Sequence, residues 1–313
     1  MSAGVSPSYR PADLLDRFGI CSDEISEDLE TALRLIRELG LGWVELYHVW
    51  GKPLTELTAA EVDQARRLLE RYGVRVSSVG SLLLKPTLLG PVPAGRVAGD
   101  AGFRAELARL RASIANARAF DTTIIRTFSF RRDDMIGLGN PSPRLPRGGE
   151  IPEPILEKIA EGMAILCQEA GAAGMTLALE NVRSCWGNTG HNAARIIARV
   201  NSPVLRALWD PGNDFVSGGV PYPDGYAAVR SQIVHIHVKD ARVLDAASGL
   251  TSWEAVGAGE VDYAGQFAAL AADGYTGTLS LETHWHPAGS NGVEDSRRSF
   301  AGVRAALAAA ARR

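Results

Sequence analysis

Residues 233–240 read IVHIHVKD, and apolar and polar side chains alternate from Val234 to Lys239. Strict alternation is typical of a β-strand whose two faces have different surroundings. The residues at 234, 236 and 238 are apolar and form a face that can pack against helices. The opposite face carries His235, His237 and Lys239. Because a buried column of polar side chains is costly unless something binds it, this strand predicts a binding site.

Seven further segments have a strand-like composition, and helical segments alternate with them. This order is typical of parallel βαβ units, and eight such cycles favour a closed (β/α)8 barrel. The clearest helices are expected at residues 28–39, 59–72, 106–120 and 155–172, and an Ala- and Arg-rich helix at 293–311 closes the ring. The strands are expected at residues 18–22, 43–47, 74–80, 122–130, 176–181, 205–210, 233–240 and 278–283.

The alternative to a closed barrel is an open, doubly wound sheet. That fold usually has a Gly-rich phosphate-binding turn after its first strand, whereas residues 21–24 read CSDE. No change in composition marks a linker, so we expect one domain over residues 1–313. Long connections near residues 81–102 and 131–154 are rich in Pro and Gly. We expect them to cover the C-terminal face of the barrel as lids rather than as disordered segments.

Composition and charge limit the kinds of partner. The 33 basic and 36 acidic residues give a net charge of −3 without a basic tract, which argues against nucleic acid. Three cysteines without paired spacing argue against a disulfide framework. The first twenty residues are unlike a signal peptide, and no apolar run is long enough to cross a membrane. We expect a cytoplasmic protein with a small-molecule partner. The sequence leaves open whether the protein forms a homo-oligomer.

Three carboxylates and one histidine are expected at the same end of four consecutive strands. Glu180, Asp210 and Glu282 each lie at the C-terminal end of a predicted strand, level with His237. A lone glutamate there is more often a salt-bridge partner, but three close carboxylates would repel one another without a cation. The set therefore predicts one divalent cation. Its oxygen-rich ligands favour Mn²⁺, with Mg²⁺, Co²⁺ and Zn²⁺ as alternatives.

Further side chains share the inward face of the predicted strands. Glu45, on the strand at 43–47, is expected to be either an acid behind the metal ligands or an ion-pair partner. Arg126 is expected to pair with it or to reach the substrate. The parity of the strands also indicates three candidates for substrate contact, which are His235, Lys239 and His284.

Five short motifs follow one another along the chain: LEN at 179–181, WDPGN at 209–213, HIHVKD at 235–240, GAGEVD at 257–262 and LE at 281–282. In this order and spacing they resemble the sugar isomerase and epimerase superfamily, the xylose-isomerase-like barrels. The resemblance covers nearly the whole chain, residues 18–282. It implies that Glu180, Asp210, His237 and Glu282 bind one divalent metal, and that the two glutamates act as the acid/base pair.

Three more substrate contacts are suggested by the resemblance alone. Arg242 resembles a substrate-binding arginine of the ketose 3-epimerases, with a spacing one residue short. Asn213 stands where those enzymes have a histidine, and Trp186 where they have a second glutamate. The His-rich run of inosose dehydratase is absent around residues 126–129, whereas HVKD at 237–240 resembles the dehydratase and isomerase side of the family. The resemblance therefore does not imply a particular substrate.

The leading hypothesis is an isomerase or epimerase that acts on a keto sugar or a polyol-derived ketone through an enediolate. The alternative is a lyase on the same site, which expels water from a keto-inositol or an aglycone from a 3-keto glycoside. A metal-dependent endonuclease is more remote, because it needs further metal ligands and a basic face. The last alternative is a non-catalytic barrel with a binding or structural role, and the intact set of four ligands argues against it. The lack of a Gly-rich phosphate cradle favours an unphosphorylated substrate.

Overall fold

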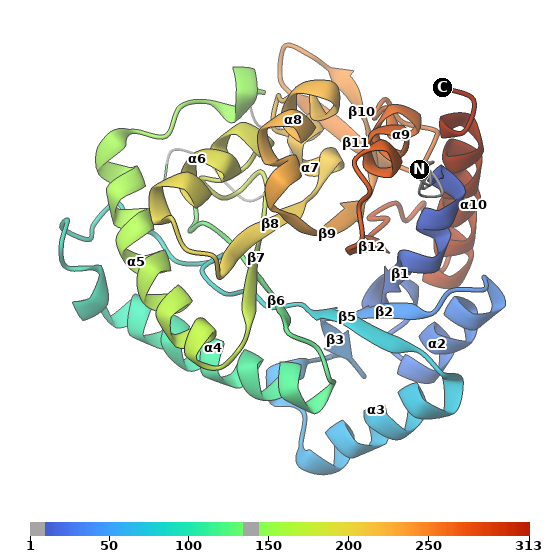
Figure 1. Cartoon of the computed structure of the whole chain (residues 1–313), viewed down its shortest axis with the longest axis horizontal. Coiled ribbons are helices and arrows are strands. Elements are labelled where there is room, and N and C mark those ends of the chain that lie inside the picture. Colours follow the sequence, from blue (N-terminus) through green and yellow to red (C-terminus); the bar gives the residue numbers. More distant parts are fainter. Residues whose placement is uncertain (1–9, 134–143) are drawn as a thin grey trace, which may run out of the picture.

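The computed structural model describes residues 10–133 and 144–313. Eight parallel strands close into a barrel in the order β1-β12-β9-β8-β7-β6-β5-β2, and helices surround it (Figure 1). The predicted (β/α)8 barrel is therefore confirmed. The barrel strands are β1 (Phe18–Cys21), β2 (Trp43–Leu46), β5 (Arg75–Val79), β6 (Ile124–Thr127), β7 (Thr176–Glu180), β8 (Leu205–Trp209), β9 (Ile233–Val238) and β12 (Thr278–Leu281).

Side-chain caps fix where several of the surrounding helices begin. Asp28, Thr58 and Asn291 each accept a hydrogen bond from a backbone N–H of the first turn, which satisfies a donor that the helix leaves free. The helices are α1 (Ser22–Ile25), α2 (Leu29–Glu38), α3 (Ala59–Tyr72), α4 (Ala101–Ala119), α5 (Glu153–Ala172), α6 (Gly190–Val200), α7 (Pro211–Val216), α8 (Tyr226–Val229), α9 (Tyr263–Ala272) and α10 (Gly292–Ala310).

The helix α4 begins at Ala101 and not at the expected Glu106. The reason is a cap at Asp100, whose carboxylate accepts the N–H of Phe103 at 3.0 Å. The buried Glu106 instead anchors the connection after β5, because its carboxylate accepts the N–H of Leu84 at 2.9 Å. The other expected long connection, at 131–154, lies partly outside the described residues, which omit 134–143.

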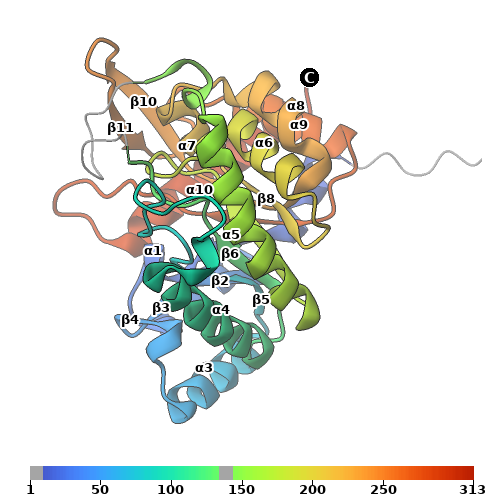
Figure 2. The same cartoon turned by 90° about the vertical axis from the view of Figure 1, so that its left-hand side faces the viewer.

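Two hairpins were not expected from the sequence. The small one pairs β3 (His48–Val49) with β4 (Lys52–Pro53), and the larger one pairs β10 (Asp240–Asp245) with β11 (Leu250–Glu254). The larger hairpin projects from the body of the protein (Figure 2). Asp240 fixes its base, because its carboxylate accepts backbone N–H groups of Gly257, Gly259 and Val261 at 2.8–3.1 Å. The GAGEVD motif therefore has a structural role here.

The apolar core lies between the strands and the helices. Ile236 of β9 and Leu281 of β12 are fully buried on the outward face of the barrel. Phe18 of β1 meets Phe267 of α9 and Phe300 of α10 edge to face, with ring centroids 5.9 and 5.8 Å apart. This packing leaves the inward face of the strands to polar groups. Among the described residues, no helix has both the length and the apolar character that a membrane span requires.

A side chain at Gly19 of β1 would collide with the neighbouring strand β2. A Cβ atom there would lie 2.5 Å from the main-chain oxygen of Trp43, which cannot move without shifting the strand. We expect Gly19→Ala to lower the free energy of unfolding by about 1–3 kcal/mol, the usual cost of overpacking. Gly42→Ala is the matched control, because no atom lies within 4 Å of its added Cβ. Equal urea midpoints for both variants would contradict this collision.

Candidate metal centre

Four side chains converge at the C-terminal end of the barrel strands. Glu180 is the last residue of β7, Asp210 is the N-cap of α7, His237 lies in β9 and Glu282 follows β12. All four are buried, and one donor atom of each lies within 4.8 Å of the others. This set, called the quartet below, consists of the four residues predicted from the ends of the strands.

One ring nitrogen of His237 has a hydrogen-bond partner, and the other, called open below, has none. Its Nε2 lies 2.9 Å from Glu45 Oε2, so a protonated Nε2 donates to that carboxylate. Its Nδ1 is buried without a hydrogen-bond partner and lies 3.1 Å from Glu282 Oε2. In this tautomer the Nδ1 lone pair points among the carboxylates. A carboxylate that fixes a histidine from behind is the usual support of a metal ligand, and the open Nδ1 fits a cation in the quartet.

Two cations already lie against the carboxylates. Arg126 Nη1 lies 3.2 Å from Glu282 Oε1 and 3.5 Å from Glu180 Oε2. Lys239 Nζ lies 3.0 Å from Asp210 Oδ2 and also contacts Glu282 Oε2. Lys239 is thus buried inside the quartet, deeper than a residue that only lines a substrate pocket.

The charges of this cluster do not cancel. The three carboxylates of the quartet and that of Glu45 carry four negative charges, and Arg126 and Lys239 carry two positive ones. Two negative charges remain while His237 is neutral, which matches one divalent cation. Burial lowers the pKa of His237, but the carboxylates of Glu45 and the quartet raise it well above its ordinary value. Burial raises the pKa of Asp210 to about 6. The cluster thus attracts positive charge.

Two asparagines hold the carboxylates in place. Asn213 Nδ2 donates to Glu180 Oε1 at 3.0 Å and to Asp210 Oδ2 at 2.9 Å. Asn181 donates to the main-chain oxygen of Asp210 at 2.8 Å and accepts the N–H of the same residue at 2.9 Å. Asn213, expected to contact substrate, is thus placed where it orients two carboxylates of the quartet. Asn181 was given no role from the sequence, although it directly follows Glu180 in the LEN motif.

His235 also lies beneath the quartet rather than at its mouth. Its Nε2 is 2.9 Å from Glu45 Oε2, and its Nδ1 is 2.7 Å from the Thr278 hydroxyl. His235 and His237 thus share one carboxylate. With both nitrogens engaged and no exposed surface, His235 positions Glu45 and does not face the site.

His284 is the expected substrate residue that the structure leaves at the mouth. Its side chain is 38% exposed, and its Nε2 lies 3.8 Å from Glu282 Oε1. The same nitrogen lies 3.4 Å from Glu24 Oε1, and the backbone N–H of His284 donates to Glu24 Oε2 at 2.9 Å. Glu24 was not identified from the sequence, because it lies in the short helix α1 and not in a strand, where parity sorts inward from outward side chains.

Two expected substrate residues do not reach the quartet. Arg242 lies in the hairpin strand β10, is 49% exposed and donates to the main-chain oxygen of Ala258 at 2.5 Å. It is displaced because the chain leaves the barrel after Val238. Trp186 is buried with the guanidinium of Arg132 over its ring, 4.5 Å from the centroid. Both positions were inferred by counting from family motifs.

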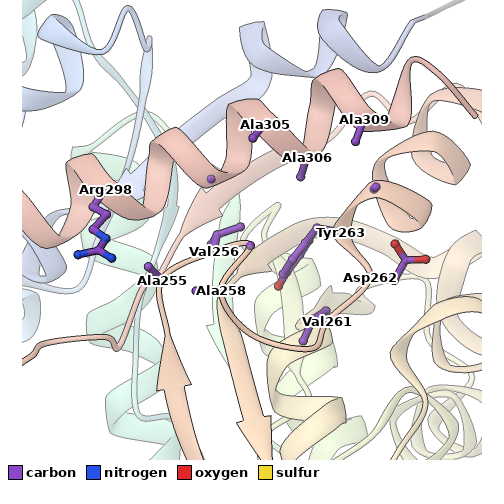
Figure 3. Close-up of a pocket in the computed structure, with 13 residues that line it drawn as sticks. Ala255, Val256, Ala258, Val261, Asp262, Tyr263, Arg298, Ala305, Ala306 and Ala309 are labelled. Atoms are coloured by element: carbon purple, nitrogen blue, oxygen red, sulfur yellow. The ribbon is translucent and has the colours of Figure 1, made fainter.

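Two hollows of the described surface lie away from the quartet. A groove of about 510 Å³ runs along α10 and the loop before α9 (Figure 3). Its lining is mostly alanine and glycine, and Asp262 and Arg298 are its only charged members. A second hollow of about 350 Å³ lies at the start of α6. Neither contains a member of the quartet.

The fold and the buried quartet together define a (β/α)8 barrel protein with a candidate metal centre. The family model described as xylose isomerase-like TIM barrel matches residues 33–305. The chain therefore belongs to the xylose isomerase-like TIM barrel family, as the motifs predict. A search of curated proteins found no match to this chain.

The solved structures that share this fold include the following three. IolI protein with a bound zinc atom is 15% identical, over 93% of this chain and 98% of that chain, with a TM-score of 0.71. L-ribulose 3-epimerase is 20% identical, over 95% and 96%, with a TM-score of 0.65. The probable 3-DHS dehydratase AsbF of Bacillus anthracis is 17% identical, over 92% and 97%, with a TM-score of 0.66. At these identities the likeness shows the fold.

Removing the imidazole of the quartet tests the assignment of the ligands. We expect His237→Ala to lose its divalent metal on dialysis, because one of four protein ligands is gone. His191→Ala is the matched control, since His191 lies at the start of α6, outside the quartet. Elemental analysis of both purified variants measures the occupancy. Full occupancy in His237→Ala would refute His237 as a ligand.

Weakening the support of His237 should have a smaller effect. Glu45→Gln removes the carboxylate that accepts from both buried histidines. We expect the affinity for the metal to fall by roughly 10–100-fold, the usual effect of losing such a support. Competition with a chelator measures the affinity, with Glu38→Gln on the surface of α2 as the control. An unchanged affinity would show that Glu45 serves only as an ion-pair partner.

Proposed function

We propose that the protein is a divalent-metal-dependent isomerase or epimerase of a keto sugar or a polyol-derived ketone. The observation that supports it is the buried quartet, in which the two glutamates flank the open Nδ1 of His237. The oxygen-rich set suits Mn²⁺, with Mg²⁺, Co²⁺ and Zn²⁺ as alternatives. When bound, the cation polarises the carbonyl oxygen and the neighbouring hydroxyl of the substrate.

The protein's own groups then move the proton. Glu282 is kept ionised in spite of its burial, because the Lys239 ammonium and His237 hold its pKa well below the ordinary value. An ionised carboxylate can remove the proton beside the carbonyl. Glu180, whose Oε1 lies 3.6 Å from the same His237 Nδ1, would take up a proton from solvent and deliver it to the enediolate in an epimerisation, while Glu282 releases the abstracted proton to solvent. Arg126 contacts both carboxylates and balances the charge as each gains and loses its proton.

The second candidate function is a lyase on the same site. After the same proton removal, expulsion of a leaving group needs an additional acid. His284 is placed to supply this acid, because its Nε2 lies 3.8 Å from Glu282 Oε1 and 3.4 Å from Glu24 Oε1. The described relatives include both an epimerase and a dehydratase, so the family fold supports either reaction.

Mass-resolved product analysis separates the two reactions. The metal-loaded protein is incubated with a library of keto sugars and oxidised polyols, and products are separated by mass. An isomer of unchanged mass supports the isomerase or epimerase. Loss of water or of an aglycone supports the lyase.

Glu282→Gln separates proton transfer from metal binding. Glutamine keeps an oxygen for the metal and nearly the same volume, but it cannot accept a proton at neutral pH. We expect the fold and much of the metal to be retained, while the rate falls by about two to four orders of magnitude. Exchange of the substrate C–H proton with deuterated solvent should fall in parallel.

The matched control for this variant is Glu169→Gln, because Glu169 faces Arg111 on the helix surface. It should keep the wild-type rate of exchange. Near-normal exchange in a fully metal-loaded Glu282→Gln protein would leave Glu282 as a ligand only, and proton transfer would then belong to Glu180 or to His284.

A further inference from the structure

Five cations gather beside the quartet around the segment 183–186. The backbone of Arg131 forms a bridge to Cys185, and the N–H of Arg132 donates to the oxygen of Ser184 at 2.9 Å. Lys85 and Arg144 lie close enough to this segment to act on it electrostatically. Burial raises the pKa of the Cys185 thiol to about 12 although the Lys85 ammonium opposes the rise, and burial together with the Arg144 guanidinium lowers the pKa of Arg183. The connections after β5, β6 and β7 supply this basic cluster, which consists of Lys85, Arg131, Arg132, Arg144 and Arg183.

Three members of the basic cluster, Lys85, Arg131 and Arg144, form no ion pair within residues 10–133 and 144–313. The Glu260 carboxylate acts on Arg144 electrostatically, but from beyond ion-pair distance. Lys85 Nζ lies 4.7 Å from the centre of the Phe128 ring. The Arg144 guanidinium donates to the main-chain oxygen of Phe215 at 2.7 and 3.2 Å. Partly buried cations without counter-charges are costly unless an anion joins them.

Two aromatic rings connect the basic cluster to the surroundings of the quartet. The Phe128 ring beneath Lys85 also has the Arg126 guanidinium 5.6 Å from its centre, and Arg126 contacts Glu180. Phe215 beneath Arg144 lies in α7, the helix that Asp210 caps. One aromatic ring thus separates Lys85 from Arg126, which contacts Glu180, and Arg144 lies against the helix that Asp210 caps.

The charge at this end of the barrel is one-sided. The connection after β1 carries Asp23 and Glu24, and Glu24 reaches the backbone of His284 beyond β12. The connections after β5, β6 and β7 carry the basic cluster instead. A substrate with a charged end would therefore be oriented across the quartet by the electrostatic field.

We propose that the basic cluster binds an oxyanion of the substrate, a carboxylate or a phosphate, while the ketone end of the same molecule lies at the quartet. This rests on the proposed function and adds the class of substrate: an anionic keto sugar or polyol derivative. Charged side chains supply the recognition, so no glycine-rich loop is required.

Binding of simple anions to the metal-loaded protein tests the proposal. Calorimetric titration uses cyclohexanecarboxylate and methyl phosphate, with uncharged cyclohexanemethanol for comparison. We expect at least one anion to bind and the alcohol not to bind. The double variant Lys85→Met/Arg144→Met should weaken that binding by at least about tenfold, the loss of a charged contact. The single variant Lys85→Met, at an accessible position, should show part of the effect if the double variant does not fold.

Arg206→Met is the matched control, because Arg206 also donates to a main-chain oxygen, that of Ser231 at 3.0 Å, but lies near the start of β8. It should bind the anion like the wild type. Metal content is measured in every variant, so that damage to the quartet is recognised. Because binding and not turnover is measured, the result stands independently of the Glu282→Gln exchange experiment.

Three results would overturn the proposal. The first is that neither anion binds the wild type. The second is that the double variant binds the anion as well as the wild type does. The third is that a short DNA duplex binds the wild type and not the double variant, which would assign the cluster to nucleic acid. Binding of the carboxylate alone or of the phosphate alone supports the proposal and identifies which oxyanion the substrate carries.

Discussion

Four carboxylates buried at one end of a barrel repel one another, and the structure around them is arranged to offset that repulsion. Arg126 reaches three of them, and Lys239 reaches the fourth, Asp210, and also Glu282. The two cations leave two negative charges, which draw a proton to His237 or a divalent ion to the quartet. Metal and proton therefore compete for the same nitrogen, and binding of the metal is linked to release of a proton. The candidate chemistry follows from this imbalance.

The barrel is what brings these charges together at a tolerable cost. Parallel strands end at one rim, so residues from β7 and β9 meet although the chain separates them widely. The helix α7 starts directly after Asp210, which lets Asn213 in its first turn donate to two carboxylates at once. Hydrogen bonds to the ionised carboxylates offset part of the desolvation. The ligands are held on strand ends and helix caps, which are more rigid than loops.

The sequence predicts the barrel and the members of the quartet, because both depend on patterns of short range. The alternation in IVHIHVKD separates His237 from Ile236, and the same parity selects Glu180 and Glu282. Parity fails once the chain leaves the barrel, and Arg242 accordingly lies in a hairpin. Strand parity also does not predict which hydrogen bonds a side chain forms. The hydrogen bonds from Asn213 to Glu180 and Asp210 were therefore not predicted, and Glu24 was missed.

Net charge shows the same limit of sequence patterns. A value of −3 with scattered charges indicates no anionic partner, because it averages over the whole surface. The topology instead gathers the cations of three separate connections around residues 183–186, opposite Asp23 and Glu24. Over distances near the Debye length, the local distribution of charged side chains decides which ligand is attracted, and the net charge of the whole protein does not. A substrate anchored by its anionic end would present one particular carbon to Glu180 and Glu282. The basic cluster would then determine where on the substrate the proton is moved, while the quartet determines that it moves.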